Sequence, residues 1–259
     1  MSSYSPTPII DTHAHYDHKQ YDQDRIEIIS QMASGGISAI INVGCDLKSS
    51  RASIALAEAH PFVYATVGVH PHDAKSLTEQ KLKELEALCA HEKVVAYGEI
   101  GLDLYHNFSP ADTQRHWFKR QLELVEALDL PVVIHSRDAA EETFGIVEMS
   151  TLRKGVIHSF SGDVALALAY VDLGFHIGIG GVVTFDKTKR LPDVVAAIPL
   201  KKILLETDAP YLTPAPFRGK RNNSTYLTYV ATTIAEIKGI TYEEVCFQTT
   251  SNARELFRI

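Results

Sequence analysis

The stretch "PIIDTHAH" (Pro8–His15) places two histidines directly after β-branched residues that are typical of a buried strand. Seven further short apolar runs follow along the chain. They are centred near Ile40, Val67, Val95, Val133, Ile157, Ile177 and Leu204. All eight runs are too apolar for an antiparallel sheet with one face in water, so they predict buried parallel strands.

Stretches with helical spacing separate these runs. "DRIEIISQMASGG" (24–36) ends on two glycines, and "TQRHWFKRQLELVEALDLP" (113–131) ends at a proline, as helices commonly do. Eight alternations of strand and helix in 259 residues predict an α/β fold of the (β/α)8 TIM-barrel type. An open doubly wound sheet would normally have fewer strands and a Gly-rich nucleotide turn, and neither a GxGxxG nor a P-loop sequence occurs.

No linker divides the chain. It contains no Pro- or Ser-rich linker, no low-complexity tract and no tandem motif, so we expect residues 1–259 to form a single domain. Two more helical stretches, 226–239 and 241–257, follow the eighth apolar run. We expect both of them to complete the outer ring of helices.

The composition favours a globular protein of a reducing compartment. Its formal net charge of −7 argues against broad attraction to nucleic acid but leaves a local basic site open. Its three cysteines, Cys45, Cys89 and Cys246, show no paired spacing. The first residues, "MSSYSPTP", lack the features of a signal peptide, and no apolar run approaches the length of a membrane span. We therefore expect a cytoplasmic protein.

Residues of metal-ligand type stand at the ends of the predicted strands. They are His13 and His15 in the first run, Glu99 in the fourth, His135 in the fifth, His158 in the sixth and Asp208 in the eighth. Because the C-terminal ends of barrel strands meet on one face, we expect these side chains to converge. Imidazole and carboxylate groups suit Zn²⁺ or Mn²⁺, and carboxylate with water suits Mg²⁺. The pattern predicts a centre of two divalent ions, whose identity stays open.

Each of these residues also has an ordinary structural interpretation. A strand-terminal histidine such as His158 often only forms hydrogen bonds, and Glu99 by itself could belong to a salt bridge. His13 and His15, two positions apart on a strand, share a face and can bind the same ion. Six such residues on one predicted face favour a metal site over six separate structural roles.

Seven motifs in order resemble those of the TatD-type metal-dependent deoxyribonucleases, a branch of the amidohydrolase-like barrels. The motifs are "DTHAH", "VGVHPHDA", "YGEIGLDLY", "PVVIHSRDA", "IHSFSG", "GIGGVVTF" and "LLETDAPYLTPAPFRGKRN". The resemblance extends from about Ile9 to Phe257. One departure follows the last motif, where this chain has Asn223, Ser224 and Thr225 in place of the family's usual acid and proline.

The resemblance implies a barrel hydrolase that uses divalent metals and cleaves the phosphodiester bonds of DNA, often from the 3′ end. It implies that His13, His15, Glu99 and Asp208 bind one ion. It also implies that Glu99, His135 and His158 bind the other ion. Asp208 would in addition take a proton from the attacking water, so that Glu99 and Asp208 are the expected catalytic residues.

Cationic residues follow the strands after which barrel phosphate sites often lie. They are Arg137 after the fifth run, Lys187, Lys189 and Arg190 after the seventh, and Arg218, Lys220 and Arg221 after the eighth. The group at 187–190 could equally solvate a helix start. Arg137 could bind a phosphate through its planar fork. We therefore expect an anionic substrate, with Arg137, Arg218, Lys220 and Arg221 among its contacts.

The roles of several other polar residues stay open. We expect His70 to face the pocket, whereas His72 could contact a phosphate or an additional ion or only shape a turn. Asp103 is expected to orient a neighbouring ligand. Tyr105 could stack on a base or simply pack. His106 is expected at the surface or in the core.

Three functions are compatible with these features. The first is an exonuclease that acts on single-stranded or frayed DNA ends through a metal-activated water. The second is a hydrolase of C–N or C–O bonds in a small molecule. Many hydrolases of that kind use a carboxylated lysine on the fourth strand, where this chain has Glu99. The third is a barrel that binds metal or nucleic acid without turnover.

Overall fold

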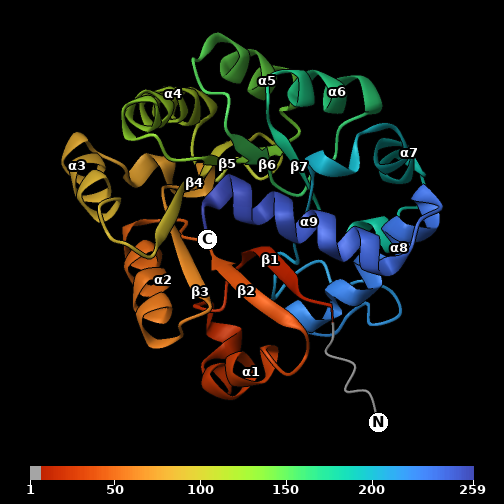
Figure 1. Cartoon of the computed structure of the whole chain (residues 1–259). Coiled ribbons are helices and arrows are strands. Elements are labelled where there is room, and N and C mark those ends of the chain that lie inside the picture. The colour runs from red at the N-terminus through yellow and green to blue at the C-terminus, as the bar shows by residue number, and fades with distance from the viewer. Residues whose placement is uncertain (1–6) are drawn as a thin grey trace.

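The structure is a computed structural model that describes residues 7–259. Eight parallel strands follow one another in sequence order around a barrel (Figure 1). Their bounds are β1 Ile9–Ala14, β2 Ile37–Asn42, β3 Val63–Val67, β4 Val94–Asp103, β5 Val132–Arg137, β6 Gly155–Ile157, β7 His176–Ile179 and β8 Ile203–Leu205. This arrangement confirms the predicted (β/α)8 TIM barrel.

Helices follow the strands and surround the barrel (Figure 1). The α-helices are α1 Arg25–Met32, α2 Leu47–Ala59, α3 Glu79–Leu88, α4 Ala111–Leu128, α5 Ala140–Met149, α6 Val164–Asp172, α7 Arg190–Ala197, α8 Leu227–Lys238 and α9 Tyr242–Phe257. The 3-10 helices are η1 Lys19–Tyr21, η2 Pro71–Ser76, η3 Gly181–Thr184, η4 Leu200–Lys202 and η5 Ser224–Tyr226. None of the helices within residues 7–259 has both the length and the apolar character needed to cross a lipid bilayer.

Local sequence explains several of these helix ends. The side chain of Asp46 accepts a hydrogen bond from the amide of Ser49 at the start of α2, and Thr241 and Glu244 bond reciprocally at the start of α9. Helix α4 ends at Asp129, whose φ of 47° is left-handed. The residues before position 7, on which part of the signal-peptide prediction rests, lie outside the described residues.

The barrel closes between β1 and the segment that follows β8. The amide of Asp208 donates to the carbonyl oxygen of His13 at 2.9 Å, and the amide of His15 donates to that of Ala209 at 2.8 Å. An isolated parallel bridge also joins Ala14 to Ala209. These bonds satisfy backbone groups that an open sheet edge would leave free, and they place the two ends of the barrel sequence side by side.

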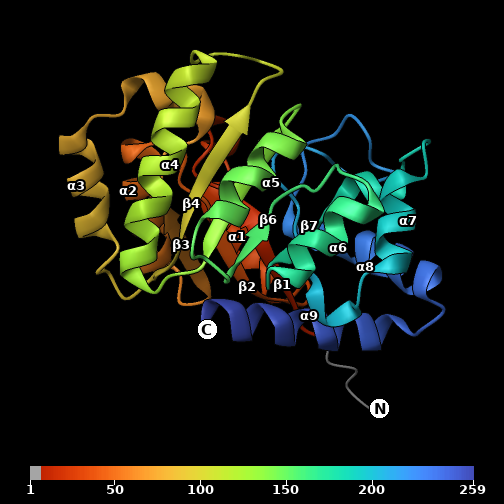
Figure 2. The ribbon, with the colours of Figure 1, turned by 90° about the horizontal axis from the view of Figure 1, so that it is seen from above.

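The prediction that both C-terminal helices belong to the outer ring is wrong for α9. Figure 2 shows α9 lying across the barrel, at the end opposite to the arrowhead of β4. Asn252 donates to the carbonyl oxygen of Ile203 at 2.8 Å, and Thr250 donates to that of Pro8 at 2.8 Å. Both carbonyls lie at strand starts, so α9 covers the N-terminal mouth.

The apolar face of α9 explains this position. Ala253, Leu256 and Phe257 are buried and share one hydrophobic cluster with residues of the strands. Those residues are Ile10, Ala39, Ile41, Val43, Val95, Ala96, Val133, Val156 and Leu204. The helical periodicity of the sequence reveals an apolar face, but it does not specify what that face covers.

We expect Phe257→Ala to lower the free energy of unfolding by about 3 kcal/mol, because it removes a buried ring from this cluster and leaves a cavity. Phe247→Ala is the matched control, since its ring lies on the same helix and is 74% exposed. Urea denaturation followed by circular dichroism measures both. Equal effects of the two substitutions would contradict the conclusion that α9 covers the N-terminal mouth of the barrel through its buried residues.

Candidate metal centre

The six predicted ligand residues lie together at the C-terminal end of the barrel. β1 carries His13, β4 carries Glu99 and β5 carries His135, whereas His15, His158 and Asp208 follow the ends of β1, β6 and β8. The side chains of His13, His158 and Glu99 are nearly inaccessible, and that of Asp208 is 19% exposed. The group is therefore buried in the barrel and reaches solvent on the Asp208 side.

His13, His15, Glu99 and Asp208 form one half of the group. His13 Nε2 lies 3.3 Å from Glu99 Oε2 and 3.2 Å from His15 Nε2. Asp208 Oδ1 lies 3.4 Å from His15 Nε2. His15 Nδ1 lies 3.1 Å from the carbonyl oxygen of Val43, so a neutral ring carries its hydrogen there and turns its Nε2 lone pair toward the group. These four side chains could hold one ion.

The other oxygen of Glu99 faces a second set of imidazoles. Glu99 Oε1 lies 2.7 Å from His135 Nδ1, 3.7 Å from His70 Nε2 and 3.9 Å from His158 Nε2. His158 Nε2 is also 3.7 Å from Asp208 Oδ1, which connects the two halves. Because its two oxygens face different imidazoles, the Glu99 carboxylate could bridge two ions. His70, predicted to face the pocket, lies against Glu99.

The electrostatics keep the acids ionised. Burial would raise the pKa of Glu99, but the imidazoles of His70, His13 and His158 hold it well below its ordinary value. Burial would likewise raise the pKa of Asp208, and its contact with His15 lowers it. Burial lowers the pKa of His13, and the neighbouring His158 lowers it further. Both carboxylates are therefore anionic near neutral pH, as ligands of a cation must be.

Several buried nitrogens of the group have no hydrogen-bond partner within residues 7–259. They are Nδ1 of His13, Nε2 of His135 and Nδ1 of His158. The last of these lies 3.0 Å from Glu206 Oε1, although not in hydrogen-bond geometry. Buried polar atoms are normally paired, so unpaired nitrogens around two carboxylates suit a site for a cation. The donor set of imidazole and carboxylate fits the divalent ions predicted from the sequence.

Glu206 is a further member of the site that the sequence analysis did not single out. It is 1% exposed, and its Oε1 accepts a hydrogen bond from the amide of Ser159 and lies 3.0 Å from His158 Nδ1. A carboxylate behind an imidazole fixes the orientation of the ring and raises its basicity. The signal was available in "LLETDAP", where Glu206 directly follows the eighth apolar run, at the barrel end where the other ligand-type residues gather.

Arg137, one of the predicted substrate contacts, lies on the same strand as His135. It ends β5, two positions after His135, and its side chain is exposed. Its guanidinium lies 4.7 Å from the centre of the Tyr105 ring, which is 62% exposed. A cation and an aromatic ring therefore stand together beside the opening of the group.

The three cations of the loop after β8 are placed differently. Arg218 donates to the carbonyl oxygen of Thr213 at 2.8 Å, and Lys220 is exposed. Arg221 pairs with Asp24 through both nitrogens of its fork, with Nη1 at 2.9 Å from Oδ1. Contact of these cations with substrate stays a prediction. The charge of Arg221 is already balanced by Asp24.

The departure at Asn223, Ser224 and Thr225 has a structural role. Ser224 is fully buried and donates to Asp11 Oδ2 at 2.6 Å, and its hydroxyl lies 2.8 Å from that of Tyr16. Asn223 caps the short helix η5 by accepting from the amide of Thr225. Ser224 thus anchors the loop to the segment that also carries His13.

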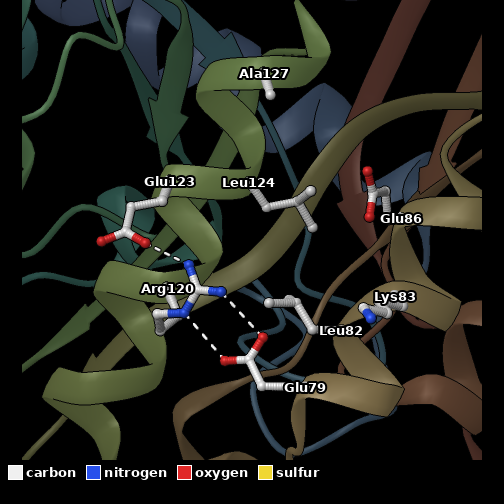
Figure 3. A pocket seen from close by; sticks show the side chains of 8 residues that line it. All are labelled: Glu79, Leu82, Lys83, Glu86, Arg120, Glu123, Leu124 and Ala127. Atoms are coloured by element: carbon white, nitrogen blue, oxygen red, sulfur yellow. Dashed lines mark hydrogen bonds and ion pairs between the residues drawn. The ribbon is translucent and has the colours of Figure 1, made fainter.

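A cavity of about 240 Å³ opens elsewhere, between α3 and α4 (Figure 3). Arg120, one of its two cations, is paired with Glu79 and Glu123, as the dashed lines in Figure 3 show. It contains none of the imidazole groups that surround Glu99. The cavity therefore lies apart from the candidate metal centre.

The chain is similar to known proteins over nearly its whole length. The family described as "TatD related DNase" matches residues 10–258. The chain is 42% identical to the uncharacterized metal-dependent hydrolase YabD of Bacillus subtilis, over 97% of this chain and 99% of that protein. It is 36% identical to the 3'-5' ssDNA/RNA exonuclease TatD of a Rahnella strain, over 93% and 94% of the two chains. The crystal structure of YjjV, a TatD homologue from Escherichia coli, superposes with a TM-score of 0.92 at 32% identity, over 97% and 98%. The chain therefore belongs to the TatD family of metal-dependent hydrolases.

Proposed function

We propose that this chain is a cytoplasmic nuclease that uses two divalent ions to hydrolyse phosphodiester bonds of DNA, from the 3′ end of single strands or frayed ends. The observation that carries this proposal is the position of Glu99. Its two oxygens face separate imidazole groups, at 3.3 Å from His13 and 2.7 Å from His135. A carboxylate placed in this way could serve both ions of a two-metal site, in which the ions lie about 3.5–4 Å apart.

The ligands divide between the two ions according to these contacts. His13, His15, Glu99 and Asp208 would hold one ion, and Glu99 with His135 and His158 would hold the other. The native metal is left open among Mg²⁺, Mn²⁺ and Zn²⁺, because this mixture of imidazole and carboxylate accepts all three. When bound, the ions would lower the pKa of a water and neutralise charge on the phosphoryl group.

Asp208 would accept the proton of the attacking water. Burial would raise its pKa, but the imidazoles of His15, His158 and His13 together hold it below the ordinary value, so the carboxylate is ionised and can take a proton. Its side chain is also the most exposed of the carboxylates in the group, which gives water access to it. Glu206 would keep His158 oriented from behind.

Arg137, Tyr105 and His70 supply contacts suited to a strand end. The exposed guanidinium of Arg137 can bind a phosphate, and the exposed ring of Tyr105 can stack on a base. His70 reaches Glu99 from η2 and would face the scissile phosphate. The net charge of −7 makes these local groups, rather than the overall field, responsible for attracting the substrate. The name of the Rahnella relative supports the direction of digestion and adds RNA as a substrate to test.

The first test is cleavage of single-stranded DNA and RNA carrying a label at the 3′ or the 5′ end. We expect metal-stripped protein to be inactive and to regain activity with Mg²⁺, Mn²⁺ or Zn²⁺, with the 3′ label released first. Glu99→Gln should reduce cleavage by about 100-fold or more, because the bridging charge is lost. Glu148→Gln, an exposed glutamate on α5, should cleave normally.

Two results would contradict the proposal. Full activity of Glu99→Gln would show that cleavage does not need the metal centre around Glu99. Absence of cleavage with every ion, combined with turnover of an uncharged amide or ester, would favour the hydrolase of C–N or C–O bonds. DNA binding without any turnover would favour the non-catalytic alternative.

We expect Glu206→Gln to weaken metal affinity or activity by about 10- to 100-fold, because the buried carboxylate beside His158 Nδ1 loses its charge. Isothermal titration with Mn²⁺ and the cleavage rate would measure the two effects. The fold should survive, since the amide keeps the size of the side chain. An unchanged affinity and rate would exclude an orienting role for Glu206.

Arg137→Ala should raise KM by about 10-fold and change kcat little, since a phosphate contact outside the reacting centre affects binding. Arg137→Lys should recover part of this loss because the charge remains. Arg254→Ala is the control, as this arginine is exposed on α9 at the opposite end of the barrel. A fall in kcat alone would place Arg137 in the chemical step instead.

A further inference from the structure

A second group of imidazoles surrounds a carboxylate beside the metal centre. Asp103 Oδ2 lies 2.6 Å from His72 Nε2 and 2.8 Å from His106 Nδ1. The donor atoms of these three residues all lie within 4.8 Å of one another. His106, expected at the surface or in the core from the sequence, is exposed and also contacts this carboxylate. The carboxylate is buried, while the side chains of His72 and His106 are 29% and 33% exposed.

The Asp103 carboxylate is fixed in place by the backbone around it. Its Oδ1 atom accepts hydrogen bonds from the amides of Tyr105 at 3.1 Å and His106 at 2.8 Å. Oδ2 is therefore the oxygen that faces the imidazoles. His135 Nε2 is a buried nitrogen with no hydrogen-bond partner in the described part of the chain, and it lies 3.6 Å from this same oxygen. An unpaired buried nitrogen aimed at the carboxylate suggests that the group is incomplete without a cation.

The two segments that carry the histidines are also held together. The side chain of Gln114 on α4 bonds both to the amide and to the carbonyl oxygen of Asp103, and donates to the carbonyl oxygen of Ser109. Ser109 donates to the carbonyl oxygen of His72 at 2.7 Å. Gln114 and Ser109 are fully buried. The positions of His72 and His106 are thus set before any ligand binds, which lowers the entropic cost of binding one.

We propose that His72, Asp103 and His106 form a separate site for one Zn²⁺ ion. Two imidazole nitrogens and one carboxylate oxygen are a common three-residue set for zinc, which leaves a fourth position for water. Mg²⁺ would bind poorly, because it prefers oxygen ligands. The partly exposed rings of His72 and His106 leave this fourth position open to solvent.

The spacing permits an ion to enter with little movement. Tetrahedral zinc at about 2.0–2.1 Å from each ligand separates the ligand atoms by roughly 3.3 Å, so each ring nitrogen must move away from Asp103 Oδ2 by about 0.5–0.7 Å. The contact of His135 Nδ1 with Glu99, at 2.7 Å, requires a similar adjustment in the main centre. The exposed ring of Phe108 packs against both His72 and His106 and would shield one side of the ion.

The test compares the zinc content of purified variants. Protein stripped with a chelator is saturated with Zn²⁺, freed of unbound metal and analysed by mass spectrometry of the metal. We expect His106→Ala to retain about one zinc ion fewer per chain than the wild type. His91→Ala is the control, because His91 pairs with a single carboxylate, Glu58, at 3.2 Å. It should keep the wild-type content.

Equal zinc content in the wild type and His106→Ala would overturn the proposal. So would an equal loss of zinc in His91→Ala. If His106→Ala unfolds, as judged by circular dichroism, His106→Gln replaces it. Loading with Co²⁺ gives a second readout, since the wild type should show more absorption in the visible range per chain than the variant.

A Glu99→Gln background separates this site from the proposed nuclease centre. Glu99→Gln should keep about one zinc ion per chain, which the added His106→Ala substitution removes. If the wild-type protein has no nuclease activity but its zinc content depends on His106, the proposed function is refuted and this zinc site is supported. If the wild-type protein has nuclease activity but its zinc content is independent of His106, this zinc site is refuted and the proposed function is supported.

Discussion

The candidate centre depends first on the closure of the barrel between β1 and the segment after β8. The backbone bonds from Asp208 to His13 and from His15 to Ala209 bring together residues that are nearly two hundred positions apart. Without this seam the sheet would have two open edges, and Asp208 would lie far from the histidine pair. The same hydrogen bonds that satisfy the strand edges therefore assemble one half of the site.

The second constraint is charge burial. Glu99 is 3% exposed and Glu206 is 1% exposed, and an isolated carboxylate in such surroundings would be strongly destabilised. Imidazoles compensate for it: His13 and His135 contact Glu99, and His158 stands between Glu99 and Glu206. The imidazoles compensate only in part for the charge of the carboxylates, and some of their ring nitrogens lack a hydrogen-bond partner among the described residues. Such a set of side chains is suited to bind cations.

The two ends of the barrel differ in the kind of side chains that cover them. At the N-terminal mouth, α9 adds an apolar lid whose residues join the hydrophobic interior. At the C-terminal mouth, polar residues gather around Glu99, and the strand ends and loops beside them carry Arg137, Tyr105 and the group around Asp103. Stability and chemistry are thus separated in space, and changes in the loops can alter ligand binding while the barrel interior stays intact.

The sequence by itself determined the strands, the barrel and the convergence of six ligand-type residues, Glu99 among them, because buried parallel strands and strand-end polar residues leave a local signal. Tertiary structure alone decided what α9 covers, since its periodicity marks an apolar face but not that face's partner. It also decided that Glu206 stands behind His158, that Arg221 is held by Asp24, and that His106 meets Asp103 and His72. These contacts depend on loop paths and side-chain directions, which are set by packing between segments distant in sequence.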